Sequence, residues 1–75
     1  MKYIVFDDIF PVIFNEAIAH KDILVSGMKP TSAGFVSIMS IESSVFAKVS
    51  GKSVGLDISS KKDDSSIITR TLLNY

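Results

Sequence analysis

The chain lacks cysteine and tryptophan, and its 75 residues include one histidine, one arginine and two prolines. Without cysteine, no disulfide can stabilise the fold and no thiolate can bind a metal. A single histidine would leave carboxylates to supply most ligands of any metal site. Lysine plus arginine number eight, as do aspartate plus glutamate, which argues against nucleic-acid binding by bulk charge. We therefore expect no metal site, no cofactor and no nucleic-acid partner.

Long apolar runs are also missing. The longest stretch without a charged residue, residues 30–41, covers twelve residues and includes three serines. Such a stretch is too short and too polar to span a bilayer. The amino terminus turns acidic at Asp7 and Asp8 and has no signal-peptide pattern. These features predict a cytoplasmic protein without a membrane partner.

The length predicts one domain, residues 1–75. In a chain this short the hydrophobic gain on folding and the conformational entropy lost are nearly equal. Isoleucine and valine total seventeen, against eight for leucine plus alanine, and this bias favours strands. The composition therefore predicts a strand-rich domain that depends on good packing or on a partner.

A β-hairpin is predicted over residues 45–58. Gly51 and Lys52 separate two runs of alternating apolar residues, and glycine at the first central position suits a two-residue turn. Three apolar pairs would then share one face of the hairpin: Val49 with Val54, Ala47 with Leu56, and Val45 with Ile58.

A strand over residues 34–41 would precede this hairpin. A three-residue loop at 42–44 would place Ile41 opposite Val45, so that Val36, Ile38 and Phe46 meet on the reverse face. An apolar reverse face must be covered, either by another element of the chain or by another molecule.

Residues 2–7 and 10–15 are predicted to form an amino-terminal hairpin, with Asp7 and Asp8 in its turn. Pro11 cannot donate a ladder hydrogen bond and so needs an unpaired side or a bulge. Alternation sorts the other side chains into two sets: Ile4, Phe6, Phe10, Val12 and Phe14 on one face, and Tyr3, Val5 and Ile13 on the other.

The remaining segments are a short helix starting at Asn15, with a strand over 22–25 as the alternative, and a loop over 29–34. A carboxy-terminal helix begins near Ser60 and Asp63, which fit a capping box, and carries a stripe at Ile68, Leu72 and Tyr75. The predicted fold is α+β: an antiparallel sheet of about five strands (an amino-terminal hairpin plus a β-meander) with the carboxy-terminal helix packed on one face.

No set of residues points to catalysis. Gly51-Lys52-Ser53 matches the end of a phosphate-binding loop, but Phe46 stands where that motif needs glycine, and a strand rather than a helix follows. We find no assembled acid, base and nucleophile, so we do not expect an enzyme.

Two segments, KPTSAGFVSI (residues 29–38) and KSVGLDISSKKDDSSII (residues 52–68), carry a resemblance. They resemble short proteins of bacterial and prophage genomes to which no activity is attached. The resemblance implies an accessory protein of a mobile element and no particular mechanism.

We therefore expect a non-catalytic interaction protein, a homodimer or a module that docks on a larger protein through a partly apolar sheet surface. Val36, Ile38 and Phe46 are the leading interface candidates, followed by Tyr3 and Ile13. The alternative is a domain that binds a small or regulatory ligand through the 30–35 segment, with Thr31, Ser32 and His20 as its contacts.

Overall fold

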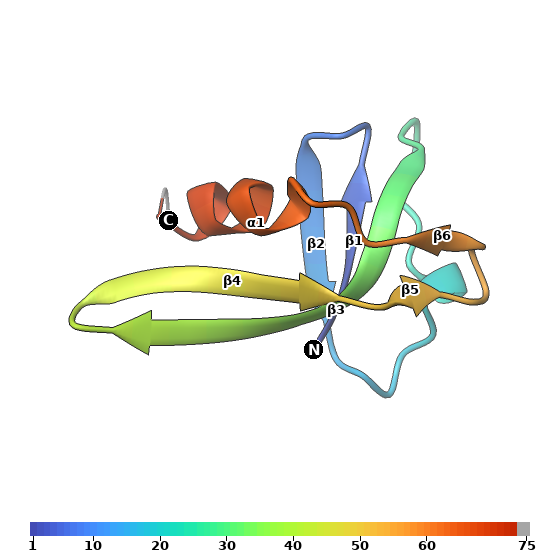
Figure 1. Ribbon diagram of the computed structural model, residues 1–75. Coiled ribbons are helices and arrows are strands. Elements are labelled where there is room, and N and C mark those ends of the chain that lie inside the picture. The colour runs from blue at the N-terminus through green and yellow to red at the C-terminus, as the bar shows by residue number, and fades with distance from the viewer. Residues whose placement is uncertain (74–75) are drawn as a thin grey trace.

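In the computed structural model, which describes residues 1–73, four strands form an antiparallel sheet in the order β2-β1-β3-β4 (Figure 1). A second, two-stranded sheet pairs β5 with β6. The α+β prediction is confirmed, with four strands in the main sheet. The elements are β1 (Lys2–Phe6), β2 (Phe10–Phe14), the 3-10 helix η1 (His20–Asp22), β3 (Pro30–Ile41), β4 (Ser44–Ser50), β5 (Lys52–Ser53), β6 (Ile58–Ser59) and α1 (Asp64–Leu73).

The β1–β2 hairpin forms as the sequence predicts. Tyr3 lies opposite Ile13 and Ile4 opposite Val12, while Asp7 and Asp8 occupy the turn with positive φ angles. Pro11 is accommodated because β2 is an edge strand. The alternation gives β1 two apolar faces, and both are fully buried.

Helix α1 covers one of these faces. Ile68 is fully buried against a cluster that contains Tyr3, Val5, Val36 and Ala47. Leu72 packs against the same cluster and confirms the predicted helical stripe, whose third member, Tyr75, lies outside the described residues.

The other face of β1 is covered by irregular chain. Ile4, Phe6 and Ala33 pack against side chains from residues 23–28 and from the β5–β6 region. The helix expected from Asn15 is wrong: Asn15 forms a turn in which its side-chain oxygen accepts from the Ala17 amide, and only η1 is helical. The predicted loop over 29–34 is also wrong, because β3 begins at Pro30 and pairs with β1.

The predicted 45–58 hairpin does not form. β4 pairs with β3 instead, and the turn after β5 comprises residues 54–57. Gly51 has the positive φ of 78° expected of a bend. At this bend the chain passes close to Gly34, and a Cβ atom on Gly34 would lie 2.5 Å from the Ser50 carbonyl oxygen. The local alternation is equally compatible with both partners, and the longer β3 offers the longer ladder.

The β3–β4 connection is a two-residue turn rather than the expected three-residue loop. Glu42 and Ser43 both have positive φ, so Ile41 pairs with Ser44 and Met39 with Phe46. This shift by one residue puts Val36 and Ile38 on one face and Phe46 on the other, which corrects the predicted grouping.

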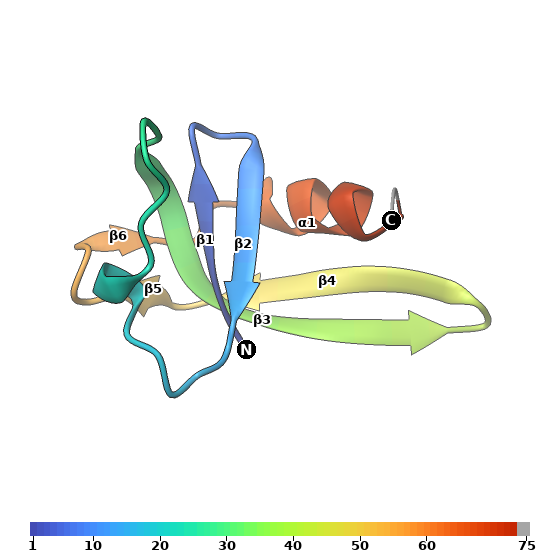
Figure 2. The ribbon, with the colours of Figure 1, turned by 180° about the vertical axis from the view of Figure 1, so that it is seen from behind.

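The β3–β4 hairpin projects from the rest of the molecule as an arm, and α1 runs beside β4 (Figures 1 and 2). We define the arm as residues 37–48, the part beyond the last contact of β3 with the amino-terminal residues at Val36. The arm makes the structure elongated, with extents of 36 × 23 × 21 Å. Among residues 1–73, no helix is both long and apolar enough to cross a membrane.

Candidate functional site

An apolar surface lies on the face of the arm opposite the one that packs on Ile68 of α1, and at Phe46 it borders α1, where Phe46 lines a hollow with Thr69 and Arg70. Met39 pairs with Phe46 on this face, and Ile41 follows two residues after Met39. Met39 is 39% exposed, Ile41 is 55% exposed and Phe46 is partly buried. We call these three residues the arm patch. Their exposure in a strand pair makes the patch a candidate contact surface.

The predicted interface residues are divided by the structure. Val36 and Tyr3 lie in the core, and Ile13 packs against that core from β2. Ile38 is 36% exposed, on the same face as Val36, whereas Phe46 belongs to the arm patch. Of the five candidates, Phe46 and Ile38 are therefore on the arm, but on opposite faces.

Sequence reasoning missed Met39 and Ile41 as surface residues, because a three-residue loop would have turned them towards the core. Glu42 and Ser43 are not residues typical of a turn with two positive φ angles, which is dominated by glycine and asparagine. No local signal marked them, because the twelve-residue length of β3, which carries it beyond the five-residue β1, is seen only in the folded sheet.

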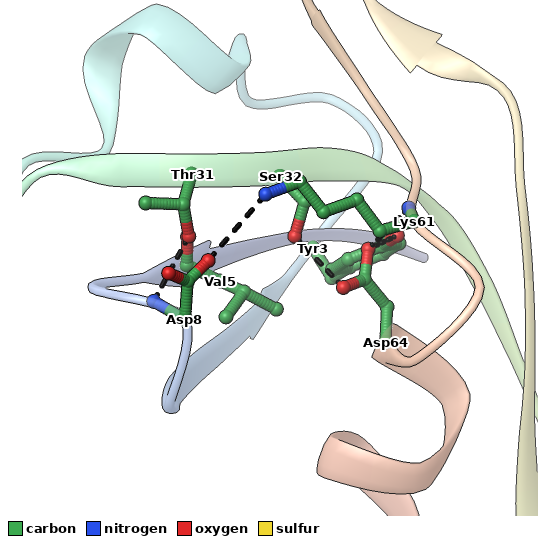
Figure 3. Close-up of polar contacts among 7 residues, drawn as sticks. All are labelled: Tyr3, Val5, Asp8, Thr31, Ser32, Lys61 and Asp64. Atoms are coloured by element: carbon green, nitrogen blue, oxygen red, sulfur yellow. Dashed lines mark hydrogen bonds and ion pairs between the residues drawn. The ribbon is translucent and has the colours of Figure 1, made fainter.

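Thr31 and Ser32, predicted as ligand contacts, direct their hydroxyl groups to the protein itself. The Thr31 hydroxyl donates to the Val5 carbonyl oxygen at 3.1 Å and accepts from the Asp8 amide at 3.0 Å. Ser32 is buried and donates to Asp64 Oδ1 at 2.8 Å (Figure 3). Both hydroxyl groups therefore hold parts of the fold together through hydrogen bonds within the protein.

Asp64 forms a buried polar centre that the sequence did not reveal. Its carboxylate, 1% exposed, accepts hydrogen bonds from the Tyr3 hydroxyl and the Ser32 hydroxyl (Figure 3). It also accepts from the Lys61 backbone amide at 2.8 Å, which caps the start of α1. The sequence pointed to Ser60 and Asp63 as a capping pair, whereas Asp64 joins the helix to β1 and β3.

Tyr3 is held in its protonated form by this centre. Burial disfavours the phenolate and raises the pKa of Tyr3 well above its ordinary value of 10.0, and the hydrogen bond to Asp64 raises it further. A phenol that stays protonated serves here as a donor to Asp64. The centre therefore stabilises the fold and supplies no exposed acid or base.

His20, the third predicted ligand contact, is also buried, at 6% exposure. Its Nε2 lies 2.9 Å from the Gly34 carbonyl oxygen, so this nitrogen carries the proton and donates. Phe14 and Phe35 contact the ring edge-to-face, with centroid distances of 5.4 and 6.0 Å. His20 is thus fixed between two aromatic rings and lines an open cavity together with Phe35.

Within the part of the chain that the structure describes, no three histidine, aspartate or glutamate side chains gather where they could hold a metal ion. The arm patch and the His20 cavity are two surface features that combine an apolar surface with nearby charged side chains. Comparison with known proteins adds no assignment to either. No protein-family model, no curated protein and no solved structure matches the chain.

Proposed function

We propose that this chain is a non-catalytic interaction protein that self-associates through the arm patch. The observation that carries the proposal is the exposure of Met39 and Ile41 beside Phe46 on an arm that projects from the body. A two-stranded hairpin standing alone is marginal in water, and a second layer on its apolar face would stabilise it. The sequence resemblance to prophage proteins fits an accessory role of this kind.

The distribution of charge on the arm favours a second copy of the chain as the partner. Glu42 lies at the tip of the arm, and Lys48 lies at its base, on the same face as Phe46. Lys48 pairs with Ser37, five residues before Glu42, so the two charges are about 17 Å apart along the arm. The arm patch lies between them.

Two arms that stack face to face in opposite directions cover the apolar arm patch and also bring the opposite charges at its two ends together. Such an arrangement has two-fold symmetry, in which each copy offers the same surface to the other. The apolar centres meet, and Glu42 of each copy lies over Lys48 of its partner, twice in the interface. A parallel face-to-face stack would instead place Glu42 over Glu42 and Lys48 over Lys48, which is unfavourable.

The size of the arm sets the expected strength. The five paired residues of each arm strand present a face of about 17 × 10 Å, smaller than the roughly 800 Å² that each partner buries in a standard interface. We therefore expect reversible association with a dissociation constant on the order of 10–100 µM.

Sedimentation velocity over a range of about 5–500 µM tests this proposal. The dimer fraction should rise with concentration in the wild type, and Met39→Glu should keep the chain monomeric while circular dichroism shows it folded. Leu24→Glu is the matched control, because Leu24 is an equally apolar side chain, 79% exposed, outside the arm. A wild type that stays monomeric throughout, or a Met39→Glu variant that associates normally, contradicts self-association.

A charge exchange tests the orientation of the two copies. Lys48→Glu should weaken association by about tenfold because it places two carboxylates together at each end. The double variant Lys48→Glu with Glu42→Lys restores opposite charges and should restore the wild-type dissociation constant. Failure of the double variant to recover would rule out the antiparallel arrangement of the arms.

A further inference from the structure

An open cavity of about 370 Å³ lies at the other end of the molecule from the tip of the arm. Its walls come from β1, from the chain around η1, from β3 and from β5 with its following turn. Residues 19–21, at and beside η1, line the cavity together with residues 52–55, from β5 and its turn. The lining residues are Lys2, Ala19, His20, Lys21, Phe35, Lys52, Ser53, Val54 and Gly55.

The lining of this cavity is cationic. Lys2, Lys21 and Lys52 come from three separate segments, and no aspartate or glutamate lines the cavity with them. Among residues 1–73, the two ion pairs join the terminal amine to Glu16 and Lys61 to Asp8, so they involve none of these lysines. In a chain with no net charge, three unpaired lysines around one cavity are a local segregation of charge.

Two of the lysines are held in place by the protein. The Lys2 ammonium donates to the Ile18 carbonyl oxygen at 3.0 Å, which keeps it beside the cavity. The aliphatic part of Lys21 lies against Gly55, where an added Cβ would be 3.6 Å from the Lys21 Cβ. The Lys2 ammonium is therefore partly ordered before any ligand arrives, which lowers the entropy lost on binding, whereas Lys21 is positioned only through its aliphatic part.

An aromatic wall accompanies the charge. Phe35 lines the cavity and is 41% exposed, and its ring is supported edge-to-face by the buried His20. His20 is itself fixed by its hydrogen bond to Gly34. An aromatic side chain held in this way offers a surface on which a flat ring can stack.

We propose that this cavity binds a small phosphorylated ligand with a flat ring, of the nucleoside monophosphate class. The three lysines supply charge-assisted hydrogen bonds to a phosphate, and Phe35 stacks with the ring. The volume lies at the lower end of the range typical of small-ligand sites, which fits one nucleotide. The site is separate from the arm patch, so ligand binding and self-association are independent properties.

Titrations followed by amide chemical shifts of the labelled protein test the site, with AMP, adenosine and inorganic phosphate as probes. AMP should bind with a dissociation constant on the order of 0.1–1 mM at low salt. Adenosine and inorganic phosphate, which each carry only one part of AMP, should bind at least about tenfold more weakly. The shifts should centre on residues 19–21, Phe35 and 52–55. Absence of binding at about 10 mM AMP overturns the proposal.

Two double variants with the same change in net charge distinguish loss of the site from an unspecific effect of charge. Lys21→Gln with Lys52→Gln should weaken AMP binding by about tenfold, whereas Lys29→Gln with Lys62→Gln makes the same charge change elsewhere and should have no effect. Equal losses in the two double variants would show an unspecific charge effect and overturn the site. Phe35→Leu should weaken AMP binding while leaving phosphate binding unchanged, and an equal loss of both would exclude stacking.

A short single-stranded oligonucleotide also contains phosphates and flat rings. Comparing it with AMP distinguishes a site for a free nucleotide from a site for a nucleic acid. AMP that competes with the oligonucleotide at similar site affinity supports a free nucleotide. Binding of the oligonucleotide more than a hundredfold tighter than AMP would overturn the small-molecule assignment. Met39→Glu should bind AMP as the wild type does, so failure of self-association and failure of the nucleotide site are measured separately.

Discussion

Strand β1 and the outer half of β3 have similar apolar sequences but opposite surroundings. Every residue from Tyr3 to Phe6 is fully buried, whereas residues 37–46 include no buried residue. β1 has a strand on each side, α1 over one face and irregular chain over the other. The arm has only its own two strands and a helix beside β4. Position in the sheet, rather than side-chain type, therefore decides which apolar residues stay exposed.

This difference in burial divides the molecule into two parts. The body holds the buried apolar clusters and the Asp64 centre, so it supplies the stability of the fold. The arm contributes fewer buried contacts, and substitutions at its exposed positions should change stability by only about 0.5 kcal/mol. Its exposed apolar side chains, such as Met39 and Ile41, therefore contribute little to the stability of the fold.

The largest effect is expected at Asp64. Asp64→Ala leaves the buried Tyr3 and Ser32 hydroxyl groups, and the partly buried Lys61 amide, without their acceptor. Each unsatisfied buried donor costs about 1–3 kcal/mol, so loss of the acceptor for the two hydroxyl groups should lower the free energy of unfolding by about 2–6 kcal/mol. Urea denaturation followed by circular dichroism measures this change.

Asp64→Asn is the matched variant for this test. It keeps an acceptor oxygen of similar size and should lose less stability than Asp64→Ala. If both variants unfold at the wild-type urea concentration, Asp64 does not join α1 to the sheet, and the body owes its stability to apolar packing alone.

A pH dependence is expected next, from Tyr3. Its pKa is raised in the folded protein by burial and by Asp64, while the unfolded chain ionises near pH 10. The stabilisation is complete below pH 10 and is lost as the pH rises above it, because the unfolded state then binds fewer protons than the folded state. The free energy of unfolding should decrease by about 1.4 kcal/mol per pH unit in this range.

Absorbance of tyrosinate at alkaline pH reports this group specifically. In a Tyr75→Phe background Tyr3 is the only tyrosine, and its phenolate should appear only as the protein unfolds. Tyr3→Phe should remove this contribution to the pH dependence and cost about 1 kcal/mol at neutral pH. A Tyr3 that titrates near pH 10 while the fold is intact would contradict its burial against Asp64.

The sequence predicts the body better than the arm for a physical reason. The β1–β2 hairpin has a period-two pattern on both faces, and only one register keeps Tyr3 opposite Ile13 and Ile4 opposite Val12. Helix α1 likewise follows from the spacing of Ile68 and Leu72. In these elements the local pattern and the tertiary partner agree.

The positions of the arm and of the His20 cavity depend on strand pairing and packing that no local pattern contains. The run 45–50 alternates equally well against 53–58 and against β3, and only the whole sheet selects β3. The turn residues Glu42 and Ser43 give no sign of their positive φ angles. Lys2, Lys21 and Lys52 are distant in sequence and meet only because η1 and β5 pack at the same end of the fold.

The smallest effect is expected at the turn of the arm. Glu42 and Ser43 have φ angles of 49° and 71°, which Asn-Gly adopts with less strain. Ser43→Gly with Glu42→Asn should stabilise the monomer by about 0.5–1 kcal/mol, raise its Tm by roughly 2–8 °C, and weaken self-association, because Glu42 is lost. Ser43→Gly alone keeps Glu42 and should retain the wild-type dissociation constant. Calorimetry at low concentration measures the stability of the monomer, and sedimentation measures self-association. If the double variant is more stable but associates as the wild type does, Glu42 is not part of the interface.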